Sequence, residues 1–340
     1  MKNSKTSRPP TATDVAKLAG VSQPVVSRAF MPDTNIAEKT REKVLKAAKQ
    51  LGYRPNLLAR SLRMNKSNII ALAISYLENP FYAQVVKELS EQLRATDRHI
   101  LLFTAPDDNQ ADPALAKVLN YQVDALVMSG TKASRELAIS FKKLGVPIVQ
   151  INRDSNYPGV STVQGEDRDA GRIIGRHLLA GGHKRFGFVS GIADSSTSLF
   201  RLEGYREYLQ SHGIDDVQIA YGNNTFEAAA NAVRQLLGSK TPPDAIFCAS
   251  DYMAFAALEV AKKEFGLKVP DDLSVVGFND VPAASLSAHD LTTFSQPAAT
   301  MVEKAIVLVD QLISGQKSRA QHLIVKGELI VRGSSRQAVS

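Results

Sequence analysis

Hydrophobic positions recur along the chain with two different periods, and the change falls near residue 66. Before it, apolar residues repeat at the three- and four-residue spacing of amphipathic helices, in segments 13–30 and 37–53. After it, short apolar runs alternate with helical segments through most of the chain. Such alternation is typical of parallel sheets covered by helices on both faces. The pattern therefore predicts a small all-α domain followed by a larger α/β domain.

Segment 13–30 predicts two short helices joined by a tight corner. Gly20 suits the corner because glycine adopts a positive φ at little cost, and Ser22 is placed to cap the second helix through the N–H of Val25. Neither helix is long enough to persist alone, so the two must pack on each other in a helix-turn-helix that a third helix over 37–53 closes. The predicted core of this domain consists of Val15, Ala16, Leu18, Ala19, Val25, Val26, Ala29, Val44, Leu45, Ala48 and Leu51.

The second of these helices turns a polar face outward. In a helix-turn-helix this face enters the major groove of DNA, where residues near its N-terminus meet base edges. Gln23 can bond an adenine, Arg28 a guanine or a phosphate, and Ser27 a phosphate oxygen. Pro24 has no N–H and can give only apolar contact, for instance to a thymine methyl group.

Residues 55–66 follow as a basic segment with one short apolar face. Pro55 ends the third helix, and Asn56 can cap a new helix of about two turns. We expect so short a helix to order only when something binds it. Apolar side chains flanked by arginines open minor-groove steps of DNA, whereas a plain linker helix packed on the larger domain is the alternative. The apolar side carries Leu58, Ala59 and Leu62, with Arg60 and Arg63 beside them.

The charge is concentrated in the first part of the chain. Residues 1–66 carry 14 Lys and Arg against 4 Asp and Glu, a net charge of +10, and the remaining residues carry 27 against 30, a net charge of −3. A basic domain joined to a mildly acidic one indicates a module that binds a polyanion. Together with the helix-turn-helix, it predicts DNA binding.

The second part of the chain predicts two similar Rossmann-like subdomains. Its first eight apolar segments fall into two groups of four, and ligands of such sheets bind beyond the carboxyl ends of the strands. We therefore expect a ligand cleft between the subdomains. The predicted strands are 68–75, 99–105, 123–130, 147–152, 185–191, 217–222, 244–250 and 273–279, with 291–296 and 322–333 as crossover and final strands.

Polar and aromatic residues follow strand after strand. Amides, hydroxyls, carboxylates and an arginine, with two or three aromatic rings, suit a polyhydroxylated ligand. For any single one of them, helix capping or loop structure is the default role, and their recurrence at strand after strand is what favours a binding role. The set comprises Asn79, Phe81, Tyr82, Ser129, Asn152, Arg153, Ser190, Phe226, Ser250, Asp251, Asn279, Asp280 and Gln296.

Several classes of function lack support in the sequence. No G-x-G-x-x-G, P-loop, G-x-S-x-G or metal-ligand spacing appears, so we expect no enzyme, no cofactor and no metal. Cys248, the single cysteine, excludes a disulfide framework and is expected to be a buried thiol in a core strand. No signal peptide or long apolar run is present, which favours the cytoplasm over a secreted solute-binding protein. A nucleoid-type architectural protein would not need the large second domain.

The first domain resembles the LacI/GalR family of bacterial transcription regulators. The stretches "TDVAKLAGVSQPVVSR" and "TREKVLKAAKQLGYRPNLLARSL" carry the resemblance, nearly without gaps. One departure is Ala37, where the family often has a capping serine, and Asn35 or Thr34 is expected to replace it. The resemblance implies that Gln23 and Pro24 set operator preference and that Leu62 is a minor-groove wedge. The implied DNA-binding residues are Thr13, Ser22, Gln23, Pro24, Val25, Ser27, Arg28, Asn56, Ala59, Arg60 and Leu62.

The second domain resembles, more loosely, the periplasmic-binding-protein-like effector domain of that family. The motifs are "NPFY", "INRD", "SLFRLEGY", "NTFEA", "ASD" and "GFND". Many members have Asp at the position of Asn279, and losing that charge while keeping Arg201 and Arg153 favours an anionic effector such as a sugar acid. The implied effector-binding residues are Phe81, Asn152, Arg153, Ser195, Thr197, Arg201, Phe226, Ser250, Asp251, Asn279, Asp280 and Gln296.

These observations predict a homodimeric, effector-responsive transcription regulator, most simply a repressor, bound to a near-palindromic operator. The regulated genes would serve uptake or catabolism of a sugar or sugar acid. A regulator responding to a purine or another small metabolite, and a sugar-binding protein without a regulatory role, are the alternatives. The predicted domains are a helix-turn-helix domain over 1–54, a hinge over 55–66, and an effector-binding and dimerisation domain over 67–340, divided into subdomains of about 67–165 plus 297–325 and about 166–292 plus 326–340.

Overall fold

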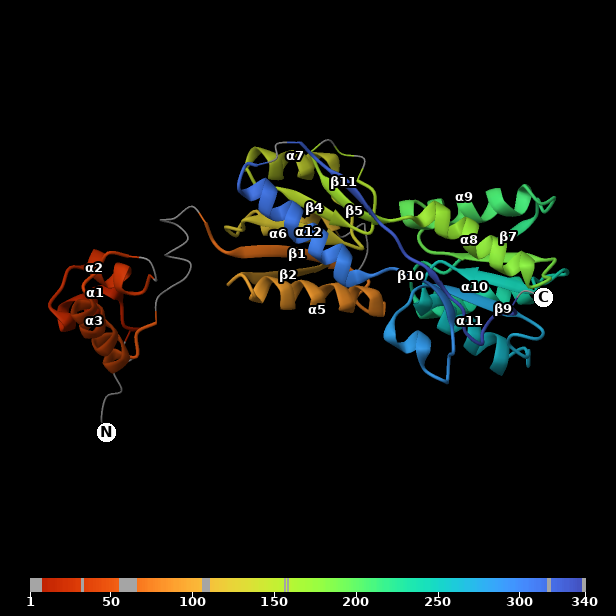
Figure 1. The fold of residues 1–340 in the computed structure, drawn as a ribbon, viewed down its shortest axis with the longest axis horizontal. Coiled ribbons are helices and arrows are strands. Elements are labelled where there is room, and N and C mark those ends of the chain that lie inside the picture. Colours follow the sequence, from red (N-terminus) through yellow and green to blue (C-terminus); the bar gives the residue numbers. More distant parts are fainter. Residues whose placement is uncertain are drawn as a thin grey trace. The chain divides into compact units, whose positions relative to one another are not determined.

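The structure is a computed structural model that divides into two units, Met1–Ser67 and Asn68–Ser340 (Figure 1). The predicted hinge residues Asn56, Ala59, Arg60 and Leu62 lie outside the described part of the chain. The structure describes residues 8–31, 34–54, 66–105, 111–155, 157, 159–316 and 319–337.

The described residues of the N-terminal unit form three helices, α1 (Ala12–Ala19), α2 (Gln23–Ala29) and α3 (Glu38–Leu51). A capping box starts α1, because the Thr11 hydroxyl accepts from Asp14 N and the Asp14 carboxylate accepts from Thr11 N at 2.9 Å. Gly20, at a φ of 61°, ends α1 and lets the chain turn into α2. The predicted corner between the two short helices is therefore present.

Small side chains form the core of this unit, and it is narrower than the sequence predicts. The prediction that Leu18, Leu45 and Leu51 lie in the core is wrong, since 47%, 42% and 36% of their surfaces are exposed. Val25, also predicted to lie in the core, is half-buried. Three helices of 8, 7 and 14 residues bury only one narrow stripe each, and alanines fill it. The buried residues are Val15, Ala16, Ala19, Val26, Ala29, Val44, Ala47 and Ala48.

The predicted caps of α2 and α3 are also wrong. The Ser22 side chain makes no capping bond, and Val25 N donates instead to the Ser22 carbonyl at 3.0 Å. Ala37 precedes α3 without a side-chain cap, and the Thr34 hydroxyl instead donates to the Arg28 carbonyl at 2.7 Å. Arg41 of α3 fastens this corner by donating Nη1 to the carbonyls that end α2, at 3.1 and 2.9 Å.

The first sheet of the C-terminal unit has six parallel strands in the order β11-β5-β4-β3-β1-β2. Helices α5 (Pro80–Arg94) and α12 (Ala298–Ile313) share one buried cluster with Ile70 and Leu72 of β1. Helices α6 (Ala111–Val118) and α7 (Arg135–Lys143) share the other with Ala71 and Ala73, so helices cover both faces. The strands are β1 (Ile69–Ser75), β2 (His99–Ala105), β3 (Ala125–Ser129), β4 (Ile148–Ile151), β5 (Ser161–Gly165) and β11 (His322–Val325).

The second sheet also has six strands, in the order β12-β10-β9-β8-β6-β7, and only β12 is antiparallel to its neighbour. As predicted, Cys248 is buried in β8, and burial raises the pKa of its thiol well above the usual range. The helices of this half are α8 (Asp167–Ala180), α9 (Ser196–Gln210), α10 (Phe226–Leu237) and α11 (Asp251–Lys263). The strands are β6 (Phe186–Ser190), β7 (Val217–Tyr221), β8 (Ala245–Cys248), β9 (Ser274–Asn279), β10 (Thr292–Ser295) and β12 (Leu329–Ile330).

The chain passes between the two sheets three times, after β5, after β10 and after β11. These passages lie close together, since Gly327 N donates to Glu166 Oε1 at 3.1 Å and Glu328 N donates to Ser295 Oγ at 2.9 Å. A side chain at Gly327 would begin 2.0 Å from the Ser295 carbonyl, so only glycine fits there. Within the described residues, no helix is both long and apolar enough to cross a membrane.

At two points of the contact between helices α8 and α9, no side chain separates the two backbones. A Cβ atom at Gly171 would lie 2.2 Å from the Arg201 carbonyl, and one at Gly204 would lie 1.8 Å from the Arg168 carbonyl. Backbone therefore meets backbone at this crossing. The approach matters for the site because Asp167 begins α8 and Arg201 lies one turn before Gly204 on α9.

We expect Gly204→Ala to destabilise the protein by about 1–3 kcal/mol or more, because the added methyl group must push the two backbones apart. The measurement is the free energy of unfolding from urea titrations of the full chain. Glu203→Ala, an exposed substitution one residue earlier on α9, is the matched control and should change it by less than about 0.5 kcal/mol. Equal effects of the two substitutions would contradict the close packing.

Candidate functional site

The outer face of α2 is polar and accessible. Ser22, Pro24 and Arg28 are exposed, while Gln23 and Ser27 are half-buried, and the opposite face anchors the helix in the core. Pro24 lies in the first turn, where a helix does not need its N–H. The predicted residue Thr13 is exposed on α1. This surface has the residue types and the accessibility that a groove-reading helix needs.

Three amide side chains join the carboxyl ends of the two sheets. Asn279, the last residue of β9, donates Nδ2 to Gln296 Oε1 at 2.7 Å, and Gln296 donates Nε2 to Asn152 Oδ1 at 2.6 Å. All three are buried; Asn152 follows β4 of the first sheet, and Gln296 follows β10 of the second. We call this hydrogen-bonded set the amide chain. It shows that the ligand-binding edges of both sheets meet here.

Arg201 of α9 is buried and held on three sides. Its Nε donates to Asp167 Oδ1 at 2.7 Å, and its Nη1 donates to the Ala249 carbonyl at 2.5 Å. The guanidinium carbon lies 3.5 Å from the centroid of the Phe278 ring. Its Nη2 is buried without a hydrogen-bond partner among the described residues.

Gly165, at the end of β5, lies between the amide chain and the Arg201–Asp167 pair. A Cβ atom at this position would be 2.9 Å from Gln296 Nε2 and 3.9 Å from Asp167 Oδ1. The two polar groups therefore flank the same glycine. The site thus combines residues that are far apart in the sequence, from β4, α8, α9 and the end of β10.

Sequence reasoning missed Ser75, Thr131 and Asp167 in this region, whereas it named Ser129 among the residues that follow the strands. Ser75 and Ser129 end β1 and β3, and their buried hydroxyls, like that of Thr131, have no hydrogen-bond partner among the described residues. Buried polar groups are normally satisfied, so unpaired ones at a ligand-binding edge are free to bond a bound molecule. The position of Ser75 at the end of a predicted strand was a usable signal, the same one that pointed to Ser129. Asp167 gave none, because its partner lies 34 positions away.

Other predicted effector residues lie at helix starts. Phe81 is the second residue of α5 and is buried in the core, with 1% of its surface exposed. Phe226 begins α10, half-buried, and contacts the Tyr252 ring at a centroid distance of 6.0 Å. Ser250 caps α11, since its hydroxyl accepts from Met253 N at 3.3 Å.

Ser195 and Thr197 flank the first residue of α9, and their hydroxyls are hydrogen-bonded to each other at 2.8 Å. Arg153, next to Asn152, is buried and has an interaction within the protein. Nearby, Asp154 N donates to Ser196 Oγ at 3.0 Å, a second bridge between the two halves of the unit. A ligand role for these residues stays a prediction.

The carboxylates of Asp251 and Asp280 are bound by the fold. Asp251 is fully buried and accepts from Val281 N at 2.8 Å and from Thr293 Oγ1 at 2.5 Å, and burial raises its pKa to about 6. Asp280 accepts from Arg332 Nη2 at 2.7 Å. Both therefore tie loops of the second sheet together, and the amide chain and Arg201 do not contact them in any described bond.

A hollow of about 540 Å³ lies at the outer edge of the first sheet. None of the twelve predicted effector residues lines this hollow, although Asp154 of its lining directly follows the predicted residue Arg153 in the sequence. Its lining consists of Asp154, Ser155, Tyr157, Gly159, Gln164, Ala320 and His322.

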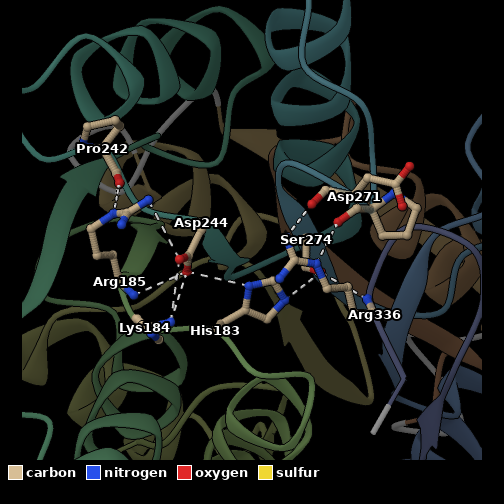
Figure 2. Close-up of polar contacts among 9 residues, drawn as sticks. His183, Lys184, Arg185, Pro242, Asp244, Asp271, Ser274 and Arg336 are labelled. Atoms are coloured by element: carbon tan, nitrogen blue, oxygen red, sulfur yellow. Dashed lines mark hydrogen bonds and ion pairs between the residues drawn. The ribbon is translucent and has the colours of Figure 1, made fainter. Parts of the chain in front are cut away.

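A second polar cluster lies at the opposite end of the second sheet, where its strands begin (Figure 2). His183 Nε2 and Ser274 Oγ are 2.8 Å apart, and His183 Nδ1 is 3.4 Å from Asp244 Oδ1. The contacts run from serine to histidine to aspartate, as in a hydrolase triad. Ser274, however, is fully buried and accepts from Arg336 N at 2.9 Å. The cluster therefore anchors the C-terminal segment and is not an active site. Within the described residues, no group of side chains could hold a metal ion.

Comparisons with known proteins agree with this architecture. Residues 11–56 match the family model of bacterial regulatory proteins of the lacI family, and residues 176–335 match the periplasmic binding protein-like domain. The chain is 32% identical over 340 residues to the HTH-type transcriptional repressor CytR of Escherichia coli (strain K12), covering 99% of both proteins.

Two solved structures are similar over nearly the whole chain. The transcriptional regulator CelR–cellobiose complex has a TM-score of 0.72 at 30% identity, covering 96% of this chain and 100% of that one. The lac repressor dimer bound to operator and the anti-inducer ONPF has a TM-score of 0.83 at 26% identity, covering 97% and 100%.

The fold and these matches define a DNA-binding transcription regulator with a periplasmic-binding-protein-like domain, and not an enzyme. The chain belongs to the LacI family. The fold class that the sequence predicts, a small helix-turn-helix domain and an α/β domain of two similar halves, is confirmed.

We expect His183 to make the protein less stable in acid. Burial, with a smaller contribution from Arg336, lowers the pKa of His183 from 6.5 to about 4. Between these pH values the unfolded chain binds a proton at His183 and the folded protein does not, so stability falls as the pH falls. In His183→Gln, the slope of unfolding free energy against pH between 4 and 6.5 should be shallower by up to about 1.4 kcal/mol per pH unit.

The measurement is a series of urea titrations across this pH range. His212→Gln, at an exposed histidine, is the control and should keep the slope of the unchanged protein. A His183→Gln slope equal to that of the control would show that His183 is not held neutral.

Proposed function

We propose that the chain is an effector-responsive repressor that binds a near-palindromic operator as a homodimer and controls genes for uptake or catabolism of a sugar or sugar acid. One observation carries this proposal. The chain combines an accessible polar face on α2 with unsatisfied buried hydrogen-bonding groups where two parallel sheets meet. The solved relatives bound to operator and to cellobiose support the two halves of the proposal.

On the DNA side, α2 would lie in the major groove. Gln23 would read a base edge, Arg28 a base or phosphate, and Pro24 would contact a thymine methyl group. Ser22, Val25, Ser27 and Thr13 would complete the contact surface. The wedge role of Leu62, with Asn56, Ala59 and Arg60 beside it, stays a prediction for residues outside the described ranges.

On the effector side, a ligand at the amide chain would touch both halves of the C-terminal unit at once. Arg201 Nη2 would donate to it from the second half, and the hydroxyls of Ser75 and Ser129 would bond it from the first. A ligand that bonds both halves favours one arrangement of the two sheets over others, and such a shift could be passed on to the predicted hinge over 55–66.

We expect Gln23→Ala to relax base preference at one operator position in each half-site. Losing a bidentate contact to a base costs about 1–3 kcal/mol of discrimination. The measurement is selection of duplexes from a random pool by the full chain, followed by binding to the selected duplex across a range of salt concentrations. Lys49→Ala removes an exposed charge from α3 and should lower affinity for all duplexes alike. A selected sequence unchanged by Gln23→Ala would contradict base reading by this residue.

We expect Arg201→Gln to abolish the effector response while operator affinity without effector stays within about twofold. The effector is first found by the rise in melting temperature of the full chain in a panel of sugars, sugar acids, nucleosides and purines. Release from the selected duplex is then measured with that compound. Arg234→Gln, at a partly exposed arginine paired with Glu264, is the matched control and should keep the response. A normal response in Arg201→Gln would remove Arg201 from the site.

A further inference from the structure

The chain turns after β9, and two residues of this turn have positive φ angles. Asn279, the last residue of β9, has a φ of 118°, and Asp280 has a φ of 54°. Residues other than glycine adopt such conformations at a cost, and they keep them only where the surrounding structure determines them. Asn279 also begins the amide chain, through the bond from its Nδ2 to Gln296 Oε1. The strained turn therefore sets the direction in which this amide leaves the backbone.

Asp251, the first residue of α11, holds this turn. Its Oδ2 accepts from Val281 N at 2.8 Å, and its Oδ1 accepts from Thr293 Oγ1 at 2.5 Å. Thr293 Oγ1 in turn accepts from Asp280 N at 3.4 Å. Both backbone N–H groups that follow Asn279 are thus bound to Asp251, one directly and one through the Thr293 hydroxyl.

The carboxylate of Asp251 lies behind the turn and not in the site. It is fully buried, and its described hydrogen bonds go to Val281 and Thr293 and not to the amide chain. A Cβ atom at Gly277 of β9 would lie 2.2 Å from Asp251 Oδ1, so the carboxylate occupies space that only a glycine leaves free. Asp251 therefore reaches the site through the turn.

A second tie on the turn is more accessible to water. The Asp280 carboxylate accepts from Arg332 Nη2 at 2.7 Å, and the side chains of this pair are 25% and 16% exposed. Water can replace such a bond at a small cost. No water reaches Asp251, and without its carboxylate the buried Val281 N would lose its partner. Asp251 is therefore the tie on which the conformation of the turn depends.

We propose that Asp251 is a positioning residue of the effector site. It keeps Asn279 and Asp280 at their positive φ angles, and this places the Asn279 amide against Gln296 without any contact between Asp251 and the effector. The proposal rests on the proposed function, since it concerns the same site.

The direct test is whether Asp251 and Gln296, which share no described bond, depend on each other. Gln296→Ala removes the partner of the Asn279 amide, and it is made in the unchanged protein and in Asp251→Ala. The readout is the unfolding equilibrium constant from urea titrations of the full chain at one protein concentration, at pH 8, where Asp251, with its pKa of about 6, is ionised. The factor by which Gln296→Ala raises this constant should be at least about fivefold smaller in Asp251→Ala, because the amide is no longer held against residue 296.

Asp244→Ala is the matched control. Asp244 also accepts from two backbone N–H groups, those of Lys184 and Arg185, but it lies at the opposite end of the same sheet. A residue that only stabilises the sheet has no reason to depend on the amide chain. The effects of Asp244→Ala and Gln296→Ala should therefore be additive within about twofold.

Two further variants keep the test decisive. Asp251→Asn should restore the coupling to Gln296, because the amide oxygen can accept from Val281 N while the amide nitrogen donates to Thr293 Oγ1. If Asp251→Ala does not fold, Thr293→Val takes its place, since it removes the hydroxyl between Asp251 and Asp280 N and keeps the shape of the side chain.

Binding is measured on the same variants by calorimetry with D-glucose, D-glucuronate, adenosine and hypoxanthine. A compound that binds the unchanged protein should bind Asp251→Ala about tenfold more weakly, because the site is no longer preorganised. Unchanged affinity for such a compound would overturn the proposal, as would additive effects of Asp251→Ala and Gln296→Ala. The coupling decides alone where none of the four compounds binds. Operator binding by the unchanged protein tests the proposed function separately.

Discussion

The close crossing of α8 and α9 is the constraint on which the effector site depends. Two glycines let the backbones touch, and this contact puts Asp167 and Arg201 within hydrogen-bonding distance in a dry interior. A guanidinium can be buried there only because its counter-charge arrives with it. The Phe278 ring and the Ala249 carbonyl then fix its direction, so the crossing of the two helices determines which N–H group of Arg201 is left without a partner among the described residues.

The amide chain gives the two sheets a direct polar connection in addition to the three chain passages. Each of its hydrogen bonds joins neutral groups, so its strength does not depend on pH in the physiological range. A ligand that inserted between Asn152 and Gln296 would replace one bond with bonds of its own to both sides. The cost of opening the chain would then be small, which is the condition for a ligand to shift the arrangement of two halves.

The regular elements were predictable because apolar periodicity reports burial, and the strands of both sheets were found apart from β5. That strand reads Ser-Thr-Val-Gln-Gly. Its Ser161 and Thr162 can be buried because backbone and hydroxyl bonds to Gln321 and to His322 of β11 satisfy them. Strand ends likewise pointed to Asn152, Asn279 and Gln296. Partners such as Asp167 could not be found, because a hydrogen bond between residues far apart in sequence leaves no local pattern. Leu18 and Leu45 had helical spacing, yet alanines filled the narrow core instead.

The order of strands has a consequence for how the protein is made. The first sheet needs β11 at its edge, and the second needs β12 and the segment that Arg336 fastens beside Ser274. Both pieces come from residues 322–336, so neither half can be completed on the ribosome before that stretch has emerged. The two halves must mature together, whereas the three N-terminal helices, whose contacts are all local, can fold long before synthesis ends.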